Sequence, residues 1–83
     1  MNLTLPQLGV LAYAAASDRF TIRQATKATS LTSETAREAV EELAEGGLLE
    51  RNGTAGLRAR AYTITPNGLA ALAVITEQGG GTS

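Results

Sequence analysis

The glycine pair Gly46-Gly47 divides the sequence into two parts that differ in the spacing of their apolar residues. Before the pair, apolar side chains recur at intervals of three and four residues, which is the spacing of one face of a helix. After the pair, residues 58–65 follow a period of two that places Tyr62 and Ile64 on one face, as in a strand. Because glycine readily adopts the left-handed conformation that ends a helix, the pair predicts helices before it and strands after it.

Three helices are predicted before the glycine pair, each preceded by a threonine. The hydroxyl groups of Thr4, Thr21 and Thr32 can each accept a hydrogen bond from the first turn of the helix that follows. The predicted helices span about residues 5–17, 22–29 and 33–45. In the first helix and just before it, the residues expected to face the core are Leu3, Leu5, Leu8, Leu11, Ala12 and Ala15. In the second helix they are Ile22, Ala25 and Ala28, and in the third Ala36, Ala39, Val40 and Leu43. The single phenylalanine, Phe20, is also expected in the core.

The residues after the glycine pair predict a β-hairpin. Residues 48–51 form its first predicted strand and residues 58–65 the returning strand. The pairs Asn52-Gly53 and Ala55-Gly56 are typical of turns, so we expect the hairpin tip within residues 52–57. A hairpin alone is marginally stable, but one that packs beside helices is not.

A last helix is predicted over residues 67–77, with Leu69, Leu72, Ala73 and Ile75 facing the core. Thr65 can cap this helix, and Pro66 fits its start because the missing N–H would have no partner there. The sequence thus predicts one domain over residues 1–77 and a flexible, glycine-rich tail over residues 78–83. The fold is expected to be mainly α with a small β-hairpin, in the order helix, helix, helix, strand, strand, helix, which is the winged helix-turn-helix.

The composition excludes several classes of function. The 83 residues include no cysteine and no histidine, so disulfides, a zinc site, an imidazole base and a thiolate nucleophile are all excluded. We therefore expect no enzyme, no cofactor and no metal. The N-terminus lacks a basic segment, and the apolar run over residues 8–16 is too short to span a bilayer, which predicts a cytoplasmic protein without a membrane partner.

Two stretches resemble the MarR- and PadR-type winged-helix transcriptional regulators. Residues 30–51 resemble the turn, recognition helix and first wing strand of those proteins, with Thr32, Leu43 and Gly47-Leu48-Leu49 at the matching places. The stretch Tyr62-Thr-Ile-Thr-Pro-Asn-Gly68 resembles their second wing strand and the start of the following helix. The resemblance implies a DNA-binding regulator, with helix 33–45 in the major groove and a wing over residues 51–62 on the backbone or the minor groove.

The candidate DNA-binding residues follow from this placement. The N-terminal residues of a recognition helix lie at the base edges, and an arginine there can bind guanine with two hydrogen bonds, which favours Arg37 as the specific reader. Arginines of the wing and basic residues of the second helix would bind phosphates or a narrow minor groove. The full set is Arg23, Lys27, Ser33, Glu34, Thr35, Arg37, Glu38, Arg51, Arg58 and Arg60.

The charge distribution leaves alternatives open. Residues 33–50 carry six glutamates against Arg37, a net charge of −5, whereas residues 51–65 carry three arginines and no acid. Arg37 could pair with Glu34 or Glu41 on a solvated face, and the wing arginines could serve only to block strand-edge aggregation. The acidic third helix could also dock a protein partner, or the chain could be an accessory domain of a longer protein. For a regulator, we expect a homodimer formed through the first and last helices, on double-stranded DNA.

Overall fold

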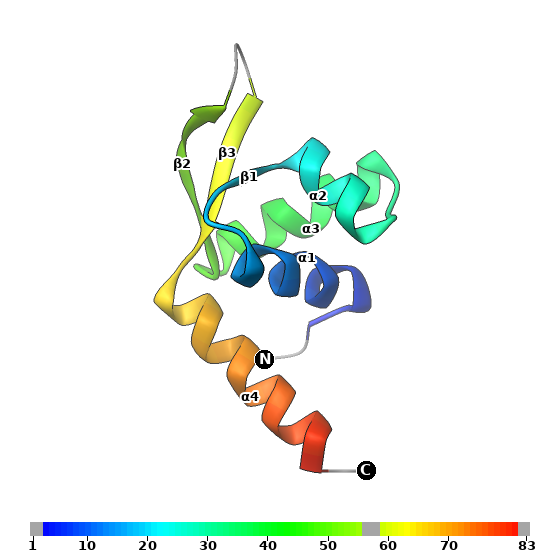
Figure 1. The fold of residues 1–83 in the computed structure, drawn as a ribbon, viewed down its shortest axis with the longest axis vertical. Helices are drawn as coiled ribbons and strands as arrows, with labels where there is room; N and C mark the ends of the chain where they lie inside the picture. Colours follow the sequence, from blue (N-terminus) through cyan, green and yellow to red (C-terminus); the bar gives the residue numbers. More distant parts are fainter. Residues whose placement is uncertain (1–2, 56–58, 82–83) are drawn as a thin grey trace.

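The computed structural model describes residues 3–55 and 59–81. Three helices pack together at the base of a long β-hairpin, and a fourth helix leaves the hairpin toward the opposite end of the molecule (Figure 1). The predicted order of helices and hairpin strands is confirmed, with one added strand. The elements are α1 (Leu5–Ala16), β1 (Phe20–Thr21), α2 (Ile22–Thr29), α3 (Ser33–Glu45), β2 (Leu49–Ala55), β3 (Ala59–Ile64) and α4 (Pro66–Gly81).

The threonine caps are confirmed at the starts of α1, α2 and α3. The hydroxyls of Thr4, Thr21 and Thr32 each accept a hydrogen bond from the backbone N–H three residues later, at 3.2–3.3 Å. In α1 and α2 the side-chain oxygens of Gln7 and Gln24 in turn accept a hydrogen bond from the backbone N–H of the capping threonine, each at 2.9 Å. These reciprocal pairs satisfy two first-turn donors at once and fix where each helix begins.

The strand β1 was not predicted. It pairs antiparallel with β3, Phe20 opposite Tyr62 and Thr21 opposite Ala61, and gives a sheet of order β1-β3-β2. Two residues are too few to show a period, and the pairing exists only because β3 offers its free edge. Phe20 lies in the core as expected, 1% exposed, with its ring 5.5 Å from that of Tyr13 in an edge-to-face contact.

The core-facing stripe was predicted correctly for α3 and wrongly for most of α1. All four α3 residues of the predicted stripe are buried, but in α1 the buried residues are Val10, Leu11 and Ala14, while Leu5 is 83% exposed. The expected Ala12, Ala15 and, in α2, Ala28 are also exposed. α1 is apolar on nearly every side, so its sequence does not define one inward face, and its packing against α3 and α2 sets the rotation.

The strand β2 is longer than predicted, because Asn52 and Gly53 form a β-bulge and not a turn. Both lie opposite the single residue Ala61 of β3, and Gly53 supplies the positive φ, 72°, that such a bulge requires. The hairpin continues beyond the bulge to Ala55. Residues 56–58, which include the rest of the predicted tip, lie outside the described residues.

The hairpin and α4 meet at a tight joint around Thr65 and Gly68. The Thr65 hydroxyl donates to the Gly47 carbonyl at 2.6 Å and accepts from the Gly68 N–H at 3.0 Å, which confirms the predicted cap. A Cβ atom on Gly68 would lie 2.2 Å from the carbonyl oxygen of Leu48 and 2.7 Å from the Ile64 side chain. Only glycine fits this position, which gives a physical reason for the Thr-x-x-Gly spacing.

The inward face of α4 differs from the prediction. Leu72 packs against the core as expected and Ile75 is half-buried, but Leu69 is 49% exposed and Ala73 is exposed. The reason is the close contact of Gly68 with Leu48 and Ile64 of the hairpin, which sets the rotation of α4 about its axis and turns Leu69 toward the surface.

The helix α4 ends at Gly81 and so includes residues 78–81 of the segment that was expected to form a tail. None of the helices described is long and apolar enough to cross a membrane.

Candidate nucleic-acid interface

The helices α2 and α3 form a helix-turn-helix unit. The turn passes through Ser30, whose φ of 61° is left-handed, and Thr32 then caps α3. The buried residues Ala25 and Ala36 belong to the two helices, and side chains this small permit a close approach of the backbones. This packing of α2 against α3 fixes which side of α3 is exposed.

The exposed side of α3 has a central ridge and two flanks. At 3.6 residues per turn, the positions farthest from the buried stripe are those of four exposed glutamates, which we call the acidic ridge. Ser33 and Arg37 lie on the flank toward α2, and Thr35 and Glu42 on the flank toward the start of α1. The residues of the acidic ridge are Glu34, Glu38, Glu41 and Glu45.

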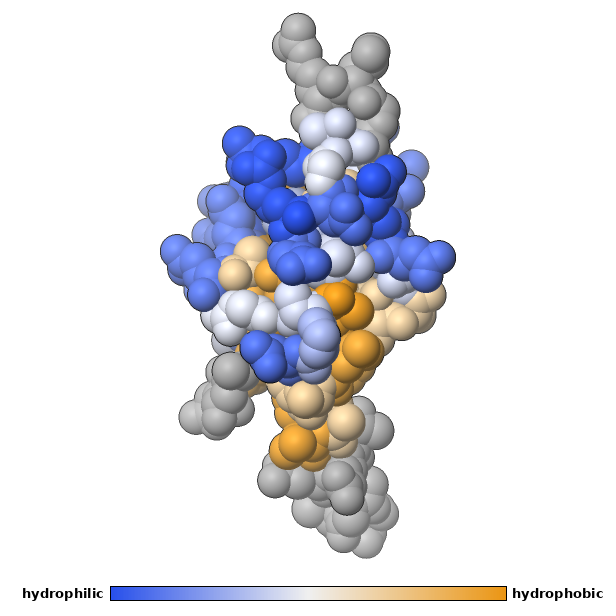
Figure 2. Space-filling model, turned by 90° about the vertical axis from the view of Figure 1, so that its left-hand side faces the viewer, coloured by the Kyte–Doolittle hydropathy of each residue, from blue (hydrophilic) through white to orange (hydrophobic). Residues whose placement is uncertain are grey.

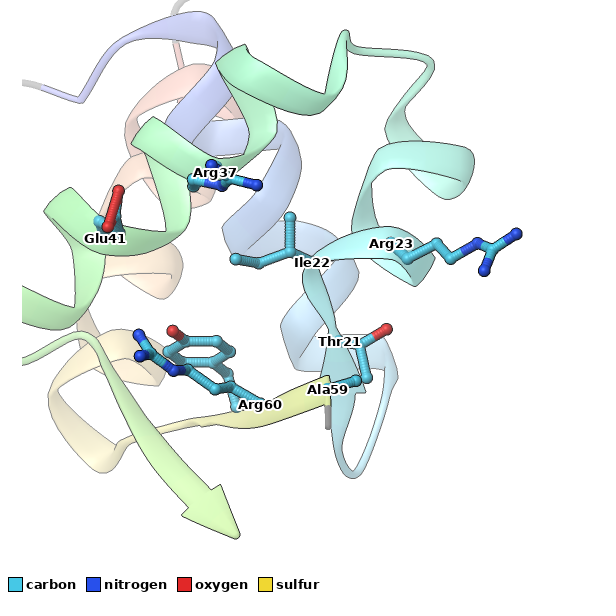
Figure 3. A pocket seen from close by; sticks show the side chains of 8 residues that line it. Thr21, Ile22, Arg23, Arg37, Glu41, Ala59 and Arg60 are labelled. Carbon is cyan, nitrogen blue, oxygen red and sulfur yellow. The ribbon is translucent and has the colours of Figure 1, made fainter. Parts of the chain in front are cut away.

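A groove of about 400 Å³ separates α2, α3 and β3 (Figure 3). Arg37 and Arg60 lie on facing walls with Ile22 between them, and the Arg23 side chain extends outward from the rim. The groove is lined by Thr21, Ile22, Arg23, Arg37, Glu41, Ala59, Arg60 and Tyr62.

A second groove, of about 450 Å³, continues the first along α2. The two share Ile22, Arg23 and Arg37, and the second adds Lys27 and the hydroxyls of Thr26 and Ser33. We call the two together the basic groove. Five of the predicted DNA-binding residues, from three different elements, thus line one continuous surface: Arg23, Lys27, Ser33, Arg37 and Arg60.

The other flank of α3 has the opposite character. A groove of about 310 Å³ between α1 and α3, which we call the acidic groove, is lined by Thr4, Pro6, Thr35, Glu38, Ala39 and Glu42. No basic side chain is among these residues. Gln7 closes one end, since its amide donates to the Glu42 carboxylate at 2.8 Å. Two predicted site residues, Thr35 and Glu38, therefore lie apart from the basic groove.

The remaining predicted arginines belong to the hairpin. Arg51 and Arg60 are exposed, and their register partners in the hairpin are Tyr62 and Thr54. Since cross-strand partners share a face of a sheet, Arg51 lies on the same face as Tyr62 and Arg60. Arg58 lies outside the described residues.

Arg19 is a further basic residue at the hairpin that the sequence did not indicate. Its guanidinium donates to the carbonyl of Asn52, in the β-bulge, at 3.3 Å. The contact depends on the pairing of β1 with β3, which no periodicity in the sequence predicts. Arg19 lines neither part of the basic groove.

The polar and apolar surfaces lie at opposite ends of the molecule. Figure 2 shows hydrophilic residues gathered over the half that carries the hairpin and hydrophobic residues over the half that carries α4. The exposed large apolar residues are Leu5 at 83%, Leu69 at 49% and Val74 at 52%. Across residues 3–55 and 59–81, no three acidic side chains lie close enough together to hold a metal ion, and the chain has no histidine or cysteine.

Known proteins resemble this chain in structure more clearly than in sequence. No protein-family model matches the sequence, and no curated protein matches it. Among solved structures, a MarR family transcriptional regulator from Silicibacter pomeroyi is 27% identical, with a TM-score of 0.78 over 89% of this chain and 50% of its own. BpsR of Bordetella bronchiseptica is 26% identical, with a TM-score of 0.85 over 92% of this chain and 55% of its own.

The chain has a MarR-type winged-helix fold. The hairpin of β2 and β3 is the wing of this fold, and α3 lies at the place predicted for the recognition helix. A mutant MarR from E. coli, complexed with operator DNA, has the same fold, with a TM-score of 0.76 and 21% identity over 86% of this chain and 51% of its own. The chain spans about half the length of the regulators that it matches. These similar proteins are transcriptional regulators and not enzymes.

Proposed function

We propose that this chain is a DNA-binding transcriptional regulator, with α3 in the major groove and the wing on the adjacent backbone or minor groove. The observation that carries the proposal is the basic groove, where cations from α2, α3 and β3 line one surface beside the recognition helix. The solved MarR bound to operator DNA supports it, because that protein has the same fold. Such a role would place the protein in the cytoplasm, with the chromosome.

The proposal divides the candidate residues into two groups by their positions. Basic residues that flank the recognition helix or extend from the wing would bind phosphates: Arg23, Lys27, Arg51, Arg58 and Arg60. Residues at the start of α3 would face base edges: Glu34, Thr35 and Glu38. Ser33, beside them, lines the basic groove, and Arg37, the expected guanine reader, lies between the two groups.

The acidic ridge sets the strength of binding. Carboxylates near the phosphates repel DNA, so we expect weak affinity for arbitrary sequences, and the contacts of the basic residues with phosphates make that affinity fall as salt rises. A glutamate that reaches the floor of the major groove can accept a hydrogen bond from a cytosine amino group. The ridge would thus reduce non-specific binding more than specific binding.

We further propose that two copies associate through α1 and α4. Both helices carry exposed apolar residues, of which Leu5, Leu69 and Val74 are the largest, and a helix that is apolar all round is normally covered. A dimer would double the number of basic grooves and bind two half-sites one helical turn apart. Light scattering over a range of protein concentrations tests this, and a monomer at every concentration would contradict it.

Fluorescence anisotropy with a mixed-sequence DNA duplex, at about 50 mM and about 200 mM salt, tests the proposed function. We expect binding at the lower salt concentration that weakens sharply at the higher one. Arg51→Gln with Arg60→Gln should weaken binding, whereas Arg19→Gln, which removes a charge outside the basic groove, should have a much smaller effect. Absence of affinity at the lower salt concentration would contradict a DNA-binding function.

The acidic ridge favours a second candidate function, in which α3 docks a basic protein partner. Its four glutamates are exposed and lie opposite the buried stripe of α3, whereas Arg37 lies on a flank. The two functions differ in the effect of Glu34→Gln with Glu45→Gln. A protein-docking surface would lose affinity for its partner, whereas a DNA-binding surface would gain affinity for the duplex.

A further inference from the structure

We propose that the basic groove holds the phosphates of one DNA strand, and that Arg37 binds those phosphates and not a base. The inference rests on the proposed DNA-binding function and deepens it, because it assigns the partner's backbone to one flank of α3. It also differs from the role predicted for Arg37 from the sequence, which was to bind guanine.

Arg37 lies to one side of the acidic ridge. Arg37 lines both halves of the basic groove, so its side chain lies over the flank of α3 that faces α2. The positions that extend farthest from the core belong to Glu34 and Glu38. When a helix enters the major groove, its outermost ridge reaches the base edges, whereas its flanks face the two phosphate walls.

The chemistry of the basic groove suits a sugar–phosphate backbone. Apolar atoms of Ile22 and Tyr62 line it together with cations from three elements, α2, α3 and β3. Deoxyribose can pack against the apolar atoms while guanidinium groups bind the phosphate oxygens with paired hydrogen bonds. The hydroxyl of Ser33 supplies a neutral donor of the kind that often contacts phosphates, whereas that of Thr26 donates to the Ile22 carbonyl within α2.

The acidic groove makes this binding one-sided. Its lining includes the carboxylates of Glu38 and Glu42 and no cation, so it repels the phosphate wall that would face it. Glu42 is also held in place by the hydrogen bond from Gln7. Each copy of the chain would therefore bind the backbone of one strand and be repelled by the backbone of the other.

The salt dependence of binding tests the role of Arg37. Each phosphate contact adds about 0.9 to the slope of log affinity against log salt concentration. Arg37→Gln should lower the magnitude of this slope by about 1 and weaken binding to all sequences alike, while Arg37→Lys should retain the slope. The control Arg19→Gln removes the same charge outside the groove and should leave the slope unchanged.

Two results would overturn the role given to Arg37. If Arg37→Gln leaves the slope unchanged but reduces the discrimination between duplex sequences, Arg37 reads a base. If the variant changes neither slope nor affinity, Arg37 only pairs with an acidic neighbour such as Glu41, which lines the same groove. If the wild-type chain binds no duplex at low salt, the proposed function itself fails, which distinguishes that outcome from these two.

The one-sided binding has its own test. A duplex of about 12 base pairs has room for one recognition helix and its wing, since a half-site occupies about 10 base pairs. With neutral methylphosphonate linkages throughout either one strand, the chain should still bind through the charged strand and lose only about twofold in affinity. A loss near that of the fully neutral duplex, or a halved salt slope, would show that both strands are bound and would overturn the inference.

Discussion

The two flanks of α3 share one helix and one buried stripe, yet they present opposite charges. The flank toward α2 and the wing belongs to the basic groove, whereas the flank toward α1 belongs to the acidic groove. The formal net charge of the whole chain is −1, which would not suggest a DNA-binding protein. The comparison shows that the local arrangement of charges, and not their sum, decides which face can attract DNA.

The charged residues of both flanks are exposed, so they can be exchanged without disturbing the core. What holds the flanks in place is the packing behind them, of α3 against α1 and α2 and of the wing against α4. Substitutions at the joint between the wing and α4 should disturb the basic groove, which the wing lines, and substitutions on a flank should change one groove alone.

Gly68→Ala should have the largest effect, because it displaces the wing that forms one wall of the basic groove. The added methyl group would lie 2.2 Å from a backbone oxygen of Leu48, which cannot move as a flexible side chain could. We expect a loss of about 3 kcal/mol in the free energy of unfolding, measured by urea denaturation.

Gly9→Ala is the matched control for that substitution. A Cβ atom on Gly9 would lie 3.8 Å from the nearest atom, the Thr29 methyl group, which is an ordinary contact. Since alanine is the better helix former, this variant should gain about 0.5–1 kcal/mol. Equal stabilities of the two variants would contradict the tight joint.

Charge reversal in the basic groove should have the next largest effect. Arg23→Glu with Arg60→Glu places acidic side chains on two elements that line the groove. We expect duplex affinity to fall on the order of 100-fold at low salt, because lost attraction is replaced by repulsion. Unchanged urea denaturation would show that folding is intact, and retained affinity would contradict the assignment of the groove.

Neutralising the acidic groove should act in the opposite direction. Glu38→Gln with Glu42→Gln removes two charges that repel a phosphate wall and keeps the side chains' size and an acceptor for Gln7. Affinity for a mixed-sequence duplex should rise about fivefold in the anisotropy assay, from the loss of repulsion. Glu50 lies on β2, outside both grooves, so Glu50→Gln should raise duplex affinity less. If it raised the affinity as much per charge removed, only the net charge of the chain would matter.

Gln7→Ala should have the smallest effect. Gln7 completes the cap of α1 and also donates to Glu42, whereas Gln24 completes the cap of α2 alone. Both alanine variants should lose about 1 kcal/mol of stability in urea denaturation, with Gln7→Ala losing a few tenths more. Neither should alter duplex affinity by more than about twofold. A large loss of affinity in Gln7→Ala would mean that the acidic flank takes part in binding.

Much of the fold could be predicted because its signals are local. Threonine caps and the glycine pair mark the bounds of α2 and α3, and the polar residues of α3 define its buried stripe. The bulge at Gly53 and the strand β1 could not be predicted, since each exists only through pairing with β3. The apolar sequence of α1 gave no single inward face.

The candidate site was predicted residue by residue but not as a surface. The sequence indicated Arg23, Lys27, Arg37 and Arg60, but their convergence on one groove depends on how α2 and β3 pack against α3. The same packing separates Thr35 and Glu38 from them. Arg19 lies outside the basic groove, and its contact with the bulge could not be predicted because it follows from β1.

The most direct test of the account is a two-dimensional NMR titration of the 83-residue chain with a short DNA duplex at low salt. The account predicts that backbone amide signals of Arg23, Lys27, Arg37 and Arg60 shift with added DNA. The signals of Gln7 and Glu42, which lie on the side of α3 away from the basic groove, should stay in place. Shifts confined to the acidic groove, or no shifts at all, would contradict it.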